Sequence, residues 1–162
     1  MARIRIAGDE VVMSTNPSQQ QSQQFRISGY DALRAARQEV DDALVAPATE
    51  PAAWRGALDG SLEALEAAFT RHRTVSELPG GPLDQAVAAK PGMRLAAQRL
   101  RNEHPVLLEE LASLRAMARA EGMDIEALRW RVSAHQDAVR RHMAKGADLI
   151  HEAVWRDEGG EG

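Results

Sequence analysis

The chain has no cysteine among its 162 residues, and this absence excludes several kinds of chemistry. Without a thiol there is no disulfide, no thiolate nucleophile and no thiolate-ligated metal. The metal ligands that remain are histidine, aspartate and glutamate. These side chains suit iron, zinc or manganese.

Two further absences bear on partners and location. No run of about 18 apolar residues is present, and the amino terminus has no basic stretch followed by an apolar one. Neither a membrane span nor a signal peptide is therefore indicated. The net charge of -4 leaves no basic surplus for neutralising phosphates. We expect a cytoplasmic protein whose partners include neither nucleic acid nor a membrane.

Recognisable catalytic patterns are also missing. The sequence contains no phosphate-binding loop, no nucleophile motif and no triad spacing. This favours a binding or sensing protein over an enzyme of high turnover. A metal-dependent oxidase or hydrolase is kept as a further alternative.

The composition that remains is typical of a helical domain. Hydrophobic residues make up 44% of the chain and charged residues 27%, which indicates one soluble globular unit. Alanine, leucine, glutamate and arginine dominate after Ser28. Four helices are expected, and the links between the first and second and between the third and fourth are short. Short links favour antiparallel neighbours, so the sequence predicts an all-α, antiparallel, up-down-up-down four-helix bundle. Its helices are expected at 28–45, 49–76, 93–120 and 124–155, with a helical turn at 83–89.

The two ends of the chain differ in composition from this core. Residues 16–24 read NPSQQQSQQ, a polar stretch with nothing to bury. We therefore expect a flexible leader over 1–27, the bundle over 28–156 and a disordered tail over 157–162. Met13 begins a stretch that resembles an ordinary protein start, so residues 1–12 are hypothesised to precede the natural start.

Three of the five histidines take the place of an aliphatic residue on the apolar stripe of a predicted helix. Spacings of three and four put every member of a stripe on one helix face. If these faces meet, the three imidazoles point into one core, where each needs a polar partner or a metal. The stripes are Leu58, Leu62, Leu65, Phe69, His72; Ala97, Leu100, His104, Leu107, Leu111, Leu114; and Leu128, Val132, His135, Val139, His142, Leu149.

The height of each histidine in the bundle follows from its position along its helix. His104 and His142 each lie about seventeen residues from the connection between the helices expected at 93–120 and 124–155. Because a helix rises by about 1.5 Å per residue, the two histidines are expected at the same height in the bundle. His72 is out of step by roughly 9 Å, a difference that the 77–91 connection would have to absorb. Pro105 predicts either a kink beside His104 or a break in that helix.

Two carboxylates lie near the predicted level of the histidines. Glu77 and Glu103 are therefore included with the three imidazoles as candidate metal ligands. His135 is two turns from His142 and His151 is on the opposite side of the same helix, so neither is chosen. A histidine on an apolar face is also explained by a hydrogen bond to a carbonyl or carboxylate, and this alternative stays open.

Three segments resemble bacterial hemerythrin-like, or HHE cation-binding, four-helix bundles. They are AFTRHRTVSELPGGPL (68–83), RLRNEHPVLLEEL (99–111) and HMAKGADLIHEAVWRDEGGE (142–161). The resemblance implies a non-haem iron site between helices, with oxygen, nitric oxide or redox sensing or binding as its role. Carried over by position, it names His72, Glu77, Glu103, His104 and His142.

The sequence also departs from the hemerythrin pattern. Hemerythrins place H-x-x-x-E, H-x-x-x-H and H-x-x-x-x-D on successive helices so that two irons share carboxylates. Here Glu77 and Asp148 each come one place late, and Leu108 stands where a second histidine is expected. One place rotates a helical side chain by about 100°. The first helix has no histidine, so a mononuclear or altered dinuclear site is expected, with iron preferred and zinc or manganese as alternatives.

Two functions of different classes are kept. The first is a hemerythrin-like metal-binding protein with a small gas or redox ligand. The second is a metal-free interaction or scaffold bundle with a degenerate site, in which the histidines are buried polar contacts or a pH-responsive core. No protein partner is predicted for either.

Overall fold

The computed structural model describes residues 17–155, and side chains within 30–153. The expectations for residues 1–16 and for the tail at 157–162 lie outside the described residues. Every element in the described part is helical, which confirms the all-α prediction. The long helices are α1 (Pro17–Val45), α2 (Pro51–Glu77), α4 (Arg94–Arg119) and α5 (Ile125–Trp155), and α3 (Pro82–Ala89) with a 3₁₀ turn at Pro91–Met93 joins α2 to α4.

Two helix starts differ from the prediction. Helix α1 begins at Pro17 rather than Ser28, so the stretch expected to be a flexible leader is helical over 17–27. Glutamine has a helix propensity close to that of leucine or lysine, and proline suits the first helical position. Helix α2 has Glu50 as its N-cap instead of Thr49, and no side chain caps it. By contrast, Asp124 accepts a hydrogen bond from the Ala127 amide and caps α5 as expected.

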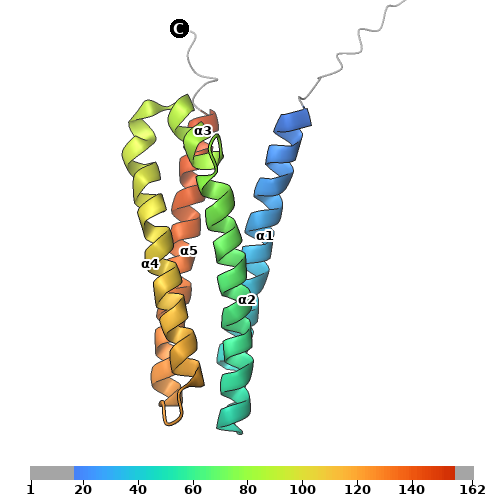
Figure 1. Cartoon of the computed structure of the whole chain (residues 1–162), viewed down its shortest axis with the longest axis vertical. Helices are drawn as coiled ribbons and strands as arrows, with labels where there is room; N and C mark the ends of the chain where they lie inside the picture. Colours follow the sequence, from blue (N-terminus) through green and yellow to red (C-terminus); the bar gives the residue numbers. More distant parts are fainter. Residues whose placement is uncertain (1–16, 156–162) are drawn as a thin grey trace, which may run out of the picture.

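Neighbouring helices run side by side in Figure 1. Helix α1 descends and α2 returns upwards, and α4 descends before α5 rises, as the colour gradient shows. Contacts between α2 and α4 agree with opposite directions for these two helices. Asp59, near the start of α2, pairs with Arg119 at the end of α4, and Glu77 at the end of α2 pairs with His104. None of the described helices is long and apolar enough to cross a membrane.

The core is built from the stripes that the sequence predicts. All members of the three histidine-bearing stripes are buried, and Leu33 and Val40 of α1 join them. Helix α4 continues through Pro105, so the predicted alternative of a break at this residue is wrong. The packing of both flanking turns outweighs the one hydrogen bond that a proline removes.

A second apolar cluster closes the upper end of the bundle. Leu83 and Ala86 of α3 pack with Leu100 of α4 and Leu149 of α5. The chain enters α3 through a tight turn in which Gly80 has a φ of 70°, a conformation that favours glycine. This turn leads into α3, whose apolar side chains pack against α4 and α5 at this end of the bundle.

Replacing Leu62 by alanine tests the central packing. Leu62 is fully buried between the helices, so Leu62→Ala should lower the free energy of unfolding by about 2–5 kcal/mol through lost contacts and a residual cavity. Urea denaturation measures this change. The control is Leu95→Ala, because Leu95 is 62% exposed and its loss should cost less than about 0.5 kcal/mol. Equal effects at both positions would contradict this packing.

Candidate metal centre

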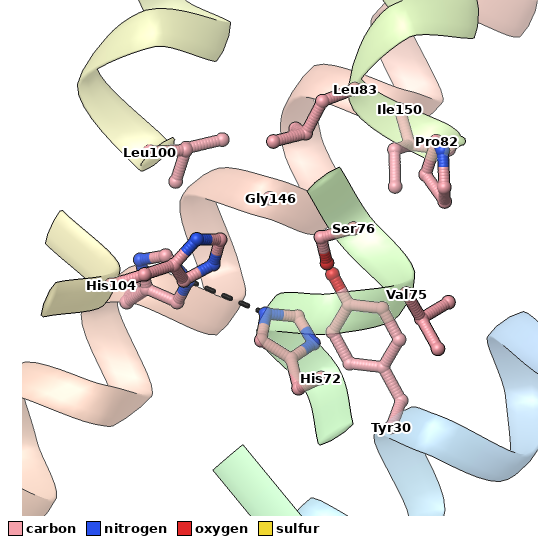
Figure 2. A pocket seen from close by; sticks show the side chains of 11 residues that line it. Tyr30, His72, Val75, Ser76, Pro82, Leu83, Leu100, His104, Gly146 and Ile150 are labelled. Carbon is pink, nitrogen blue, oxygen red and sulfur yellow. Dashed lines mark hydrogen bonds between the residues drawn. The ribbon is translucent and has the colours of Figure 1, made fainter. Parts of the chain in front are cut away.

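Three histidines from three helices converge near the upper end of the bundle. His72 of α2, His104 of α4 and His142 of α5 each offer a ring nitrogen, and these three atoms lie within 4.8 Å of one another. The residues are 5%, 1% and 2% exposed. In Figure 2 the dashed line from the His72 ring marks its contact with His142. This group could hold a metal ion.

For one pair of histidines, the distance between the two ring nitrogens is close to the distance expected when both bind one tetrahedral ion. The Nε2 atoms of His72 and His142 are 3.4 Å apart. Two imidazole nitrogens bound to one tetrahedral zinc ion, with Zn–N near 2.05 Å, are separated by about 3.3 Å. The rings of His104 and His142 lie with their centroids 4.7 Å apart. Small side-chain movements would therefore bring all three nitrogens onto one ion.

Two carboxylates hold the outer nitrogens of this group. Nδ1 of His104 is 2.6 Å from a Glu77 oxygen, and Nδ1 of His142 is 2.9 Å from a Glu103 oxygen. A carboxylate accepts, so each Nδ1 carries the hydrogen and each Nε2 keeps its lone pair directed inward. Metal-bound histidines commonly have this arrangement, in which an outer carboxylate sets the tautomer and the ring orientation.

The inward nitrogen of His104 has no hydrogen-bond partner among the described residues, although it is fully buried. A buried polar atom in this state typically costs about 1–3 kcal/mol. Five other buried side-chain atoms of the described residues also have no partner, among them Nε2 of His135, so at His104 the observation points to a ligand only together with the two imidazoles beside it. A ligand bound between the histidines would supply the partner that the protein does not.

A small cavity of about 20 Å³ lies against the three histidines. This is enough room for roughly one water molecule. Its wall includes the hydroxyl-bearing side chains Tyr30 and Ser76, and Figure 2 shows both beside His72. The rest of the wall is mostly apolar, with Val75, Pro82, Leu83, Leu100 and Ile150.

Burial keeps the imidazoles neutral. Burial, together with the smaller effect of positive charge on His104 and His142, lowers the pKa of His72 from 6.5 to about 3. Burial also lowers the pKa values of His104 and His142, although Glu77 and Glu103 act in the opposite direction. Neutral imidazole is the form that binds a metal. The site is therefore prepared for a cation at neutral pH.

Of the five predicted ligands, the structure brings the three histidines together and places the two glutamates behind them. His72 lies level with the others, so the connection through α3 absorbs the expected offset. His135 pairs through Nδ1 with Glu110 and is outside the group.

His151 is exposed, as expected for the opposite side of its helix. The sequence reasoning missed Tyr30. Its signal was a spacing of three before Leu33 on the inward stripe of α1.

Comparison with family models, curated proteins and solved structures finds no match to this chain. The hemerythrin-like interpretation therefore depends on the quoted sequence segments alone. The geometry of the three histidines stands independently of that interpretation.

The depressed histidine pKa values predict acid sensitivity of the metal-free protein. The unfolded chain takes up protons near pH 6.5, whereas buried His72 resists protonation until about pH 3. Stability should be complete above pH 6.5 and fall as the pH drops below it. Urea midpoints for chelator-treated protein between about pH 7.5 and pH 5.5 avoid most carboxyl titration. A midpoint that does not change over this range would contradict neutral, buried imidazoles.

The positions of the glutamates predict the effect of removing their charge. Glu77→Gln and Glu103→Gln should each weaken metal binding by about 10- to 100-fold, the usual cost of losing an outer partner of a metal-bound histidine. Saturated protein should still hold one ion per chain. Metal titration with a competing chelator measures both quantities. A lower number of ions at saturation would instead make the glutamate a direct ligand.

Proposed function

We propose that the protein is a hemerythrin-like, antiparallel up-down-up-down bundle that binds one divalent transition-metal ion through His72, His104 and His142. The supporting observation is the convergence of three buried imidazoles, of which His104 has an inward nitrogen with no hydrogen-bond partner among the described residues. Carboxylates fix the outer nitrogens of two of them. A covered interior site of this kind suits binding or sensing of a small gas or redox ligand by a cytoplasmic protein.

We propose one metal ion and not two, because few ligand atoms face the space between the histidines. The group consists of three imidazoles, with no carboxylate among them. The glutamates nearest to it are engaged with the outer ring nitrogens. A second ion would have to share these three donors or draw a glutamate away from its histidine. The site therefore has the composition of a mononuclear centre.

Non-haem iron is the metal we propose, with zinc and manganese as alternatives. Imidazole donors suit iron and zinc better than they suit manganese, which prefers oxygen. The resemblance to hemerythrin-like bundles favours iron, whereas the 3.4 Å nitrogen spacing also suits tetrahedral zinc. Three protein ligands leave at least one coordination position open for an exogenous ligand.

A metal-free scaffold is the second candidate, and one contact favours it. The 3.4 Å separation between His72 and His142 is also compatible with an N–H···N hydrogen bond that needs no ion. In that state two of the three inward nitrogens satisfy each other. His104 is still left without a partner, and this favours the metal-binding function.

Metal stoichiometry distinguishes the two functions. The protein, purified without a histidine tag and reconstituted with Fe(II) or Zn(II) under anaerobic conditions, should hold about one ion per chain. His72→Ala, His104→Ala and His142→Ala should each reduce this at least tenfold, because two imidazoles remain. Elemental analysis after gel filtration gives the ratio.

His135→Ala is the matched control. His135 is as buried as the proposed ligands and also contacts a carboxylate, Glu110, but it lies outside the group. This variant should keep a full equivalent of metal. Wild-type protein with less than about a tenth of an equivalent after reconstitution would favour the scaffold. Equal losses in His135→Ala would indicate general destabilisation.

A further inference from the structure

Tyr30 is the contribution of α1 to the wall of the histidine cavity. The other three long helices each supply a histidine, and α1 supplies a phenol. The Tyr30 ring lies edge-on to His72, with ring centroids 5.2 Å apart and an interplanar angle of 69°. This contact fixes the ring against one of the proposed ligands.

The space around the Tyr30 hydroxyl is made by a glycine. A Cβ placed on Gly146 would lie 3.0 Å from the hydroxyl oxygen, closer than ordinary van der Waals contact. Any larger residue at this point of α5 would push the hydroxyl away. The Tyr30 hydroxyl forms no hydrogen bond with any of the described residues. Burial raises the pKa of Tyr30, so the phenol keeps its hydrogen and is a donor.

The charges around the site leave a bound dication unbalanced. The three imidazoles are neutral, and the charge of each nearby carboxylate is opposed by a cation. Arg73 lies 3.5 Å from Glu77, and Lys145 lies 2.6 Å from Glu103. An ion of charge +2 therefore adds about two positive charges to a buried, largely apolar space, at a high cost in solvation. An anion at the open position would reduce this cost.

The size and polarity of the cavity limit what that anion is. About 20 Å³ admits a particle of roughly water size. The hydroxyl groups of Tyr30 and Ser76 are the donors in the wall that do not serve as proposed metal ligands, and they suit an acceptor. A neutral diatomic gas is a weak acceptor and would gain little from them. The wall is therefore complementary to a compact, negatively charged acceptor.

We infer that Tyr30 selects a small monoanion of hydroxide size as the resting ligand at the open metal position, by donating its phenol hydrogen to that anion. This inference depends on the proposed metal site. Any gas or redox ligand would then bind by displacing the anion. Tyr30 acts as a specificity residue for the exogenous ligand and is not itself a metal ligand.

Fluoride binding to cobalt-loaded protein tests this inference. Co(II) replaces iron or zinc and its visible spectrum reports ligand exchange, while fluoride is a monoanion of hydroxide size. Tyr30→Phe should keep one Co(II) per chain and bind fluoride about 10- to 100-fold more weakly, the usual value of a hydrogen bond to a charged group. Nitric oxide, the neutral probe, should bind both forms within about threefold, because it is a weak acceptor.

A second variant keeps the phenol but displaces it. Gly146→Ala should also weaken fluoride binding, because its Cβ crowds the Tyr30 hydroxyl. Gly60→Ala is the matched control, since a Cβ at that helical glycine meets nothing within 4 Å. Fluoride affinity that is unchanged in both Tyr30→Phe and Gly146→Ala would overturn the inference, as would an equal loss for nitric oxide. Wild-type protein that binds no Co(II) would overturn the proposed function first, and the inference with it.

Discussion

The upper half of this bundle depends on how three buried imidazoles satisfy their nitrogen atoms. Removing an imidazole from water is costly unless each nitrogen finds a partner. Glu77 and Glu103 satisfy the outer nitrogens of His104 and His142, and His72 and His142 face each other across 3.4 Å. The inward nitrogen of His104 is left over. A bound cation is the simplest single partner for all three inward nitrogens.

The rest of the fold serves this arrangement. The leucine-rich lower core fixes the register of the helices, and the ion pairs of Arg115 with Asp59 and Glu66 tie α4 to α2. The α3 segment then covers the histidines with Leu83 and its neighbours. Exclusion of water strengthens every electrostatic interaction inside the site. It also makes the charge of a bound ion costly, which is why the polar wall formed by Tyr30 and Ser76 matters.

Much of the fold and part of the site follow from helical periodicity. The stripes containing His72, His104 and His142 predict which side chains are buried, because burial on a helix face is set by spacings of three and four. The level of His72 did not follow, since the α3 connection has no regular rise to count. The role of the glutamates did not follow either, because sequence spacing does not tell a ligand from a residue behind a ligand. The helical start of α1 was missed because its glutamines carry no apolar pattern.

The central claim is that one ion is bound by the inward nitrogens of His72, His104 and His142. Anomalous diffraction from a crystal of metal-loaded protein, measured at the absorption edge of the metal, tests it most directly. The account predicts a single peak between the three rings, with metal–Nε2 distances of about 2.0–2.2 Å and with Glu77 and Glu103 still on the outer nitrogens. A peak elsewhere, two peaks at this position or no peak in metal-saturated crystals would contradict it.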